Sequence, residues 1–289
     1  MTDDPAAAAF EEHRGLLLGA AYRLLGVHSD AEDVVQETWL RWSAVDPATV
    51  NDTRAYLLTI TSRLALNRLR ELKARRESYV GPWLPEPVAT ATSDDPAKAA
   101  ELADEVSMAM LIVLESLTPL ERAAFVLTDV FGMASPEVAH ALGRSPASVR
   151  QLVSRARSHL AARPPRQVVE ESRHRAVIER FLAAAVTGDV EGLIAVLSPD
   201  VTLVTDGGGV RRAALRPIHS VEKVIRWILG VLRNPETANV AAEIRTLNGE
   251  PAVVARGPDG VHSVYFMTVE DGRITDVHAI SNPEKLGAV

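Results

Sequence analysis

The stretch SPEVAHALGRSPASVRQLVSRARSHLA, residues Ser135–Ala161, decides how the middle of this chain folds. Ser135-Pro136 and Ser145-Pro146 each place a capping side chain before a proline, and this combination begins many helices. Gly143 stands between the two start signals, where glycine commonly ends a helix. The sequence therefore predicts a short helix, a tight turn and a longer second helix.

The second predicted helix has one apolar stripe and one polar, basic side. The stripe consists of Val149, Leu152, Val153, Ala156 and Leu160. A helix of this form after a tight turn is typical of a helix-turn-helix, whose second helix enters the major groove of DNA. The predicted DNA-contacting residues are Ser148, Arg150, Gln151, Ser154, Arg155 and Arg157. The alternative is an ordinary helical hairpin with a solvated basic face; the doubled Ser-Pro signals and the missing acids favour DNA binding.

Charge is distributed unevenly along the chain. The net charge is -7 over 289 residues, which by itself argues against a nucleic-acid partner. Residues 54–70 and 138–166, however, contain several arginines and no acidic residue, while the acids gather at 30–37 and 94–105. Local basic patches, and not the sum, decide whether a phosphate backbone is attracted. The two acid-free windows therefore predict two nucleic-acid-binding surfaces.

Composition narrows the class of protein further. The chain has 47% hydrophobic and 24% charged residues. A composition of this kind is expected to fold into soluble domains. The absence of cysteine excludes disulfides and thiolate metal sites, and the eight scattered histidines form no metal-ligand motif. No segment resembles a signal peptide or a membrane span. We therefore expect a cytoplasmic protein without metal, cofactor or membrane.

Prolines divide the chain into segments. Segment 1–80 has the apolar spacing of helices, and helical spacing returns from about position 96 to position 163. Between them, Gly81–Pro87 (GPWLPEP) is too rich in proline for regular helix. After Pro164-Pro165 one amphipathic helix containing Ile178 and Phe181 precedes β-like runs. These runs cover residues 201–205, 252–255, 261–269 and 274–280.

Helices followed by a helix-and-sheet block indicate a multidomain chain. The predicted divisions are a helical domain over 1–80, a linker over 81–105, a second helical domain over 106–165 and an α+β domain over 166–289.

Three segments, in order, resemble the extracytoplasmic-function sigma factors of bacterial RNA polymerase. Asp30–Trp42 (DAEDVVQETWLRW) is similar to the polymerase-binding helix of sigma region 2, and Arg54–Arg70 to the adjoining helix that engages the −10 promoter element. Leu117–Phe125 (LTPLERAAF), with the helix-turn-helix after it, resembles sigma region 4, which reads the −35 element. The short interval between Val80 and Val106 leaves no room for region 3, as in this compact group.

The resemblance implies partners and site residues. Core RNA polymerase would bind the acidic helix face of Asp33, Gln36 and Glu37, although a solvated helix with N-terminal acids is the alternative. Promoter DNA at −10 would contact Asn51, Asp52, Tyr56, Arg63, Arg68 and Arg70, where Tyr56 could instead be a core aromatic residue. The family often has Asn and Asp where this chain has Arg63 and Asn67, so its promoter preference does not transfer.

The C-terminal part resembles SnoaL-like domains, which have the NTF2-like cone fold. The similarity lies in residues 183–206 and in marks of the sigma factors fused to such a domain: Trp83–Pro87, Asp206–Gly209 and Asn282–Leu286. Val210 replaces the lysine that follows the glycines in that subfamily. The resemblance implies a tethered regulator in place of a separate anti-sigma factor. Its predicted contact residues are Trp83, Leu84, Pro85, Asp206, Gly207, Gly208, Asn282, Pro283, Lys285 and Leu286.

Two other functions stay open at this stage. SnoaL relatives include acid–base enzymes, and Asp276 and His278, together with His262 or Asp206, could line a cone cavity; a satisfied polar pair on one strand is the plainer interpretation. Alternatively, the chain is a helix-turn-helix regulator that responds to a small-molecule ligand of the C-terminal domain. We expect a sigma factor and no enzyme.

Overall fold

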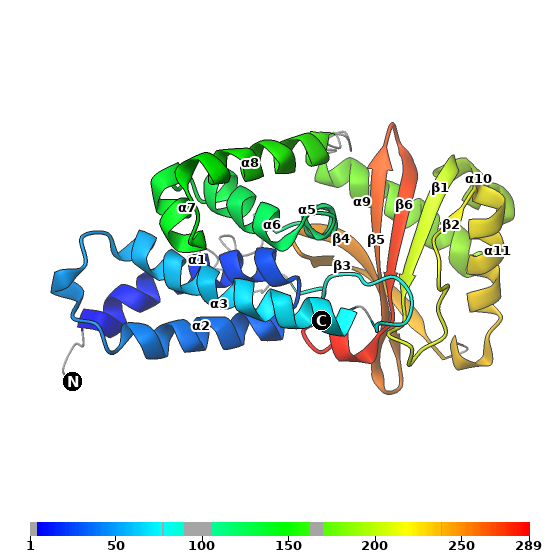
Figure 1. Cartoon of the computed structure of the whole chain (residues 1–289). Coiled ribbons are helices and arrows are strands. Elements are labelled where there is room, and N and C mark those ends of the chain that lie inside the picture. Colours follow the sequence, from blue (N-terminus) through cyan, green and yellow to red (C-terminus); the bar gives the residue numbers. More distant parts are fainter. Residues whose placement is uncertain (1–4, 77, 90–105, 162–169, 238) are drawn as a thin grey trace. The chain divides into compact units, whose positions relative to one another are not determined.

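The computed structural model describes residues 5–76, 78–89, 106–161, 170–237 and 239–289, and it forms two compact units (Figure 1). The first unit contains Met1–Glu77 and Ala91–Pro165; the second contains Ser78–Thr90 and Arg166–Val289. The predicted linker is therefore divided. Its first part, up to Ala89, belongs to the second unit, and the rest lies outside the described residues.

Three helices form the first half of unit 1: α1 (Pro5–Leu25), α2 (His28–Trp42) and α3 (Thr53–Arg76), with a short turn η1 (Pro47–Thr49) between the last two. Their apolar stripes meet in a buried core that also contains Trp42, whose indole Nε1 donates a hydrogen bond of 2.7 Å to the carbonyl of Ala6. The hydroxyls of Thr38 and Thr61 lie 3.1 Å apart and join α2 to α3. This arrangement confirms the predicted helical bundle.

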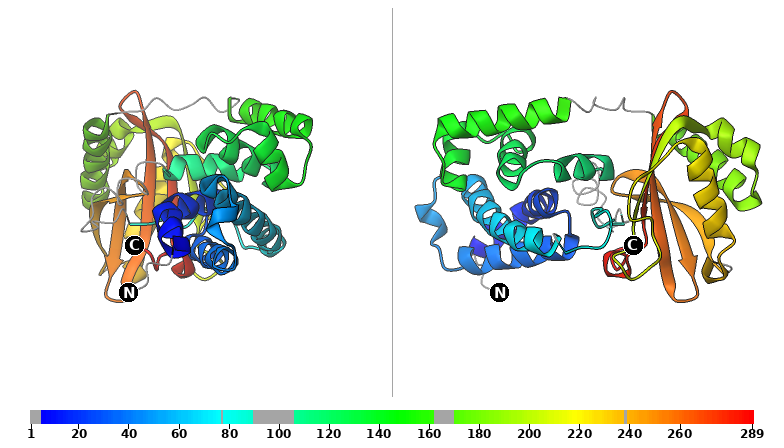
Figure 2. Two further views of the ribbon diagram at one scale, coloured as in Figure 1. Left: turned by 90° about the vertical axis from the view of Figure 1, so that its left-hand side faces the viewer. Right: turned by 45° about the vertical axis from the view of Figure 1, so that its right-hand side comes forward.

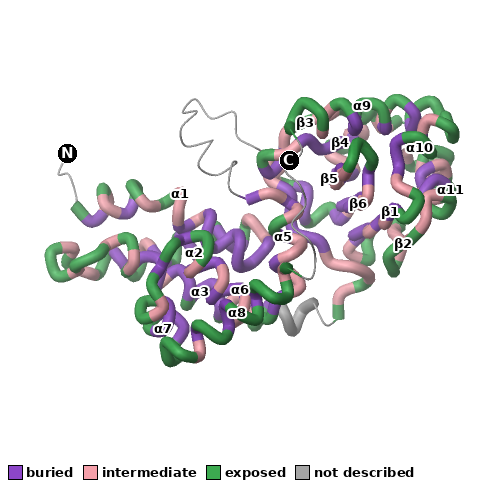
Figure 3. The backbone as a smooth tube through the Cα atoms, turned by 90° about the horizontal axis from the view of Figure 1, so that it is seen from above, coloured by how far each residue is buried: buried purple, intermediate pink, exposed green. Residues whose placement is uncertain are grey.

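The second half of unit 1 contains α5 (Met108–Glu115), α6 (Pro119–Phe125), the π-helical turn η2 (Val126–Val130), α7 (Ser135–Leu142) and α8 (Pro146–Ala161). Figure 3 shows how buried and exposed positions alternate along α7 and α8. Gly143 ends α7 with a φ of 61°. Glycine adopts this left-handed conformation without strain. The predicted helix-turn-helix is present.

One of the two predicted caps is wrong. Ser145 caps α8 as expected, since its Oγ accepts a hydrogen bond of 3.2 Å from the amide of Ser148. Helix α7, in contrast, already includes Ser135, and its N-cap is Ala134. The Ala134 amide donates to the Glu137 carboxylate at 2.7 Å. A glutamate in the first turn therefore satisfies this end of the helix in place of the serine.

Unit 2 combines a mixed sheet with three helices, α9 (Glu171–Thr187), α10 (Val190–Val196) and α11 (Val221–Leu232) (Figure 2). The strand order is β2-β1-β6-β5-β4-β3, with β1 parallel to β6 and the other pairs antiparallel. The strands are β1 (Leu197–Asp206), β2 (Ile218–His219), β3 (Ala241–Leu247), β4 (Glu250–Gly257), β5 (Gly260–Glu270) and β6 (Arg273–Ile280). Two single turns, η3 (Pro235–Thr237) and η4 (Pro283–Lys285), complete it.

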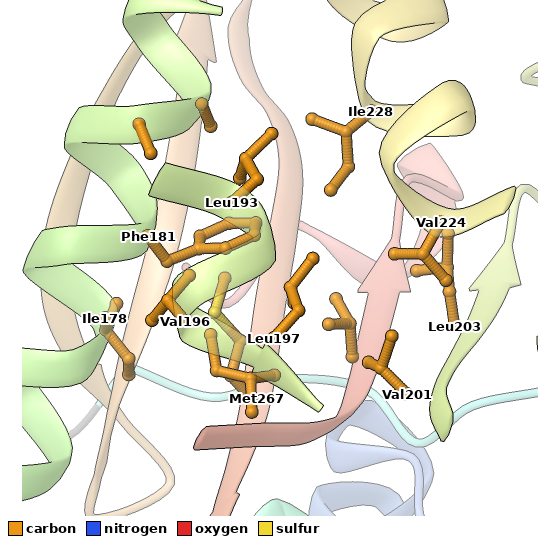
Figure 4. Close-up of a cluster of buried hydrophobic side chains, with 14 of the residues drawn as sticks. Ile178, Phe181, Leu193, Val196, Leu197, Val201, Leu203, Val224, Ile228 and Met267 are labelled. Atoms are coloured by element: carbon orange, nitrogen blue, oxygen red, sulfur yellow. The ribbon is translucent and has the colours of Figure 1, made fainter. Parts of the chain in front are cut away.

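The three helices cover one face of this sheet and bury a common core (Figure 4). Phe181 of α9, Leu193 of α10 and Val224 of α11 meet strand residues such as Leu203 and Met267. The prediction of an α+β cone is confirmed. Of the residues that the structure describes, no helix is long and apolar enough to cross a membrane.

Candidate nucleic-acid interface and linker site

The outer face of α8 presents the residues predicted to contact DNA. Arg150, Gln151 and Ser154 are exposed, and Ser148 is half-buried. Two further arginines are held by acids of the same unit. Arg155 Nε lies 3.0 Å from Glu121 Oε1, and the Arg157 guanidinium forms an ion pair with Asp129.

The ion pairs orient this basic face. A hydrogen bond from the Thr118 hydroxyl and the charge of Arg155 hold the pKa of Glu121 below its usual value. Glu121 is therefore charged at neutral pH and fixes the arginine opposite it.

The acidic face of α2 is exposed, as expected. Asp33, Gln36 and Glu37 point to solvent, and Glu37 forms an ion pair with Arg41 at 2.7 Å. Leu40 follows at helical spacing on the same stripe, and 68% of it is exposed. Leu40 was not predicted from the sequence, although a leucine in line with three polar residues was the available signal.

The residues predicted for −10 contact lie at and after the start of α3. The Asp52 carboxylate accepts a hydrogen bond of 2.9 Å from the amide of Ala55 and so caps the helix. Tyr56 is 38% exposed, and its ring lies 5.9 Å from that of Trp42. A groove of about 610 Å³ opens here. It is lined on one side by Asn51, Asp52, Tyr56 and Arg63, and on the other by Pro136, Glu137 and His140 of α7.

Arginines join the two halves of unit 1 across this groove. Arg63 donates from Nη2 to the carbonyl of His140 at 2.7 Å and from Nε to that of Ala141 at 3.1 Å. These carbonyls belong to the last turn of α7, where the helix dipole favours a cation. Arg54 donates to the carbonyl of Phe131 at 3.0 Å.

A third arginine makes the same kind of contact from α6. Buried Arg122 donates from Nη1 to the Leu24 carbonyl at 2.9 Å and to Glu115 Oε1 at 2.7 Å. The two halves of unit 1 are thus joined by charged donors on backbone carbonyls, in addition to apolar packing.

Two other arginines predicted for −10 contact have side-chain partners within the bundle of α1, α2 and α3, one buried and one at the surface. Arg68 donates to the buried carboxylate of Asp30 at 2.7 Å, and this hydrogen bond raises the pKa of Arg68. Arg70 donates to Asn67 Oδ1 at 2.8 Å. Arg68 therefore ties α3 to α2, whereas Arg70 stays at the surface.

In unit 2 the predicted regulatory residues meet around one carboxylate. Asp206, at the end of β1, is fully buried. Its oxygens accept hydrogen bonds from the Tyr79 hydroxyl at 2.5 Å, the Leu84 amide at 2.8 Å and Lys285 Nζ at 2.6 Å. We call Tyr79, Trp83, Leu84, Asp206, Asn282 and Lys285 the linker cluster.

Lys285 places its charge between the linker and the sheet. Its Nζ also donates to the Leu84 carbonyl at 2.5 Å and lies 3.9 Å from the centre of the Trp83 ring. Only 6% of Lys285 is exposed. The ion pair and the aromatic face therefore replace its hydration. Burial and the hydrogen bond to Asp206 raise the pKa of Tyr79.

Two glycines are required by this geometry. A Cβ at Gly208, which has a φ of 63°, would lie 2.5 Å from the Asn282 amide group. A Cβ at Gly207 would lie 2.3 Å from the Arg211 carbonyl oxygen. Val210, the departure from the subfamily, is 68% exposed on the same turn.

The rest of the tail and linker also dock on unit 2. Asn282 donates from Nδ2 to the Tyr79 hydroxyl at 2.9 Å, and Val88 exchanges hydrogen bonds of 3.0 Å with Asn248. Pro85 and Leu286 are buried, while Pro283 is exposed in the first position of η4. Tyr79 was not anticipated from the sequence, because nothing in its neighbourhood signals a hydrogen-bonding tyrosine.

The residues considered for acid–base chemistry do not line one cavity together. Val277 and Ala279 line cavities on the helix-covered side of β6. Asp276 and His278 alternate with them along the strand and therefore point to the other face. Asp206 belongs to the linker cluster, whereas His262 lines a cavity on the helix-covered side.

The fold and these surfaces define a class of protein: a two-region sigma factor with an α+β domain in the same chain. Comparisons agree with this assignment. Residues 9–75 match the family described as Sigma-70 region 2, and residues 107–160 match Sigma-70, region 4.

Relatives over nearly the full length extend the agreement to the C-terminal unit. The chain is 40% identical to the ECF RNA polymerase sigma factor SigJ of Mycobacterium tuberculosis, over 96% of this chain and 91% of that protein. It is 34% identical to the probable ECF sigma factor SigI of the same species, over 98% and 95%. The crystal structure of SigJ superposes with a TM-score of 0.78 at 37% identity, covering 96% of this chain and 97% of that one.

The chain belongs to the extracytoplasmic-function sigma factors of RNA polymerase. Membership confirms the resemblance found in the sequence and implies core RNA polymerase and promoter DNA as partners.

Proposed function

We propose that α2 binds core polymerase, that the start of α3 captures the −10 strand, and that α8 reads the −35 element, under control of unit 2. Support comes from exposure: the polar residues of α2 and the base-reading candidates on α8 lie at the surface. A plain repressor needs no acidic helix face with an exposed leucine. It would also bind duplex promoter alone, whereas this chain requires core enzyme.

Recognition at −35 is tested by Arg150→Ala. If Arg150 contacts a base in bidentate fashion, binding to the preferred −35 sequence weakens by about 1–3 kcal/mol, with little change on unrelated DNA. Arg144→Ala, on the turn before α8, serves as the matched control. Equal losses on all sequences would instead make Arg150 a phosphate contact.

The groove between α3 and α7 defines a resting state. Arg63, assigned to the −10 strand, is occupied by carbonyls of α7, and α7 residues form the opposite wall of the groove. A strand cannot occupy this site until α7 separates from α3. Charge-assisted hydrogen bonds contribute roughly 1.5–3 kcal/mol each, which polymerase and DNA contacts can exceed.

Unit 2 acts as a tethered regulator through the linker cluster. The buried ion pair of Asp206 and Lys285 carries this conclusion, because it fixes segment 78–89 directly after α3 ends at Arg76. A regulator on the same chain acts at a high effective concentration, so a modest affinity suffices. No catalytic step is assigned to unit 2, since Asp206, Asp276 and His278 do not line the cavities that contain His262.

The decisive experiment is run-off transcription with core polymerase, comparing the full chain with residues 1–166. We expect both to initiate at the same promoter, with different activity. Absence of initiation by the full chain and the fragment would contradict the assignments in unit 1. Equal activity would contradict regulation by unit 2.

A further inference from the structure

Unit 2 contains a cavity that the linker cluster does not use. Its volume is about 290 Å³, and its walls are mainly apolar side chains of α9, α11 and the sheet, including Phe181 and Ile228. Val186 and Leu232, which also line it, are 67% and 44% exposed. Ligand sites are typically concave and mostly apolar, with volumes of roughly 300–1,000 Å³, so this cavity has the size of a small one.

One end of the cavity is polar because β5 is irregular there. In the pairing of β4 with β5, Ala255 lies opposite Ser263 and Arg256 opposite Val261, so His262 is an extra residue. Successive side chains of a regular strand point to opposite faces, yet His262 and Ser263 both line the cavity. A β-bulge re-aims a side chain in this way, and bulges are frequent beside functional sites.

The bulge is held in place and linked to a half-buried phenol. Arg211 Nη1 donates to the His262 carbonyl at 2.7 Å. Ser263 Oγ donates to the Tyr265 hydroxyl at 3.1 Å and lies 3.3 Å from His262 Nδ1. The cavity thus ends in a row of hydrogen-bonding groups that a wholly apolar core would not need.

The electrostatics of this end favour an anion. An adjoining polar hollow shares His262, Ser263 and Tyr265 with the cavity and is also lined by Arg211, Arg212 and Glu236. Burial, and then the charge of Arg211, lower the pKa of His262, and burial raises the pKa of Tyr265. Both groups are therefore neutral hydrogen-bonding partners at neutral pH, and two arginines outnumber one glutamate.

We propose that this cavity binds a lipophilic anion, with its apolar body among Phe181, Ile228 and their neighbours and its oxyanion head at His262, Tyr265 and the two arginines. Binding does not depend on the proposed function of the linker cluster. An effect of the ligand on transcription does rest on it.

Isothermal titration calorimetry of the full chain tests the proposal with three probes that share one alkyl chain: decanoate, decan-1-ol and decyltrimethylammonium. We expect decanoate to bind most tightly and the cation least. We expect at least one of the variants Arg211→Gln and Arg212→Gln to bind decanoate less selectively over decanol. The loss of one charge-assisted contact should reduce this preference by roughly tenfold. An unchanged preference in both variants, or no preference in the wild-type chain, overturns the anion assignment.

The location is tested by blocking the cavity. Ala242, exposed on β3, lines it, and Ala242→Trp should abolish decanoate binding without unfolding the sheet. Ile194→Phe, at an exposed position of α10 outside the lining, should leave binding unchanged. Circular dichroism confirms that both variants fold. Undiminished decanoate binding to a folded Ala242→Trp variant overturns the assigned site. The run-off assay tests the sigma assignment separately, because decanoate binding does not depend on transcription.

Discussion

The buried ion pair of Asp206 and Lys285 holds both the linker and the C-terminal tail on unit 2. Asp206 is fully buried and accepts hydrogen bonds from both the linker and the tail. Asp206→Asn leaves the Lys285 ammonium buried without a countercharge, which typically costs about 3–5 kcal/mol. We expect the free energy of unfolding of unit 2 to fall by this amount, measured by urea denaturation followed by tryptophan fluorescence.

The matched control is Asp271→Asn, in the exposed turn between β5 and β6. Asp271 has a φ of 49°. Asparagine tolerates this conformation well, so the variant should be nearly neutral. A similar small effect at both positions would contradict the structural role of the Asp206–Lys285 pair.

Tyr79 gives the linker cluster a pH dependence. Its pKa is raised in the folded chain, so the neutral phenol is the stabilised form. This contribution is complete below the ordinary tyrosine pKa of about 10 and is lost as pH rises through the higher folded value. Urea denaturation at about pH 8 and about pH 11 should show a smaller loss of stability for Tyr79→Phe than for the wild-type chain. Tyr265, whose pKa is also raised, leaves a residual dependence in both proteins.

At the scale of elements, we expect the arginine contacts between α3 and the second half of unit 1 to control access to the groove. Arg54→Ala removes a donor to the Phe131 carbonyl without altering the side chains assigned to the −10 strand. Because the chain has no cysteine, a single Thr59→Cys at a buried position of the groove wall can report opening by its rate of thiol labelling. We expect Arg54→Ala to raise that rate several-fold. An unaltered rate would mean that the Arg54 contact does not help to keep the groove closed.

Elements with strong local signals were predictable, and those stabilised by distant partners were not. The Ser-Pro starts, Gly143 and the proline-rich segment indicated the helix-turn-helix and the break after α3 because capping and proline act within a few residues. Strand β3 and helix α11 were missed. In β3 the exposed alanines do not produce the alternation of apolar and polar residues that marks a strand. The start of α7 was misplaced by one residue because the Glu137 carboxylate accepts from the Ala134 amide, in place of a cap by Ser135.

The residues of the linker cluster could be predicted only where a sequence motif marks them. Motif resemblance found Trp83, Asp206 and Lys285, but Tyr79 enters the cluster only through the fold. The bulge at His262 was likewise invisible, because an extra residue is defined by the strand opposite it. Side chains alternate along β6, so Asp276 and His278 point away from the cavity. Which face of the strand meets the cavity depends on the place of β6 in the sheet, and the sequence alone does not give this.

At the scale of the whole molecule, the proposed regulation by unit 2 predicts that the tail affects initiation. Removing residues 282–289 takes Asn282 and Lys285 from the linker cluster and leaves segment 78–89 without its charged anchor. If unit 2 takes the place of a separate inhibitor, this deletion should raise run-off transcription above that of the full chain while unit 1 stays folded. Lys285→Met, which keeps most of the unbranched side chain but not its charge, should also raise transcription; Lys223→Met on α11 is the control. Transcription equal to that of the full chain in both the deletion and Lys285→Met would show that the linker cluster stabilises unit 2 without regulating the sigma regions.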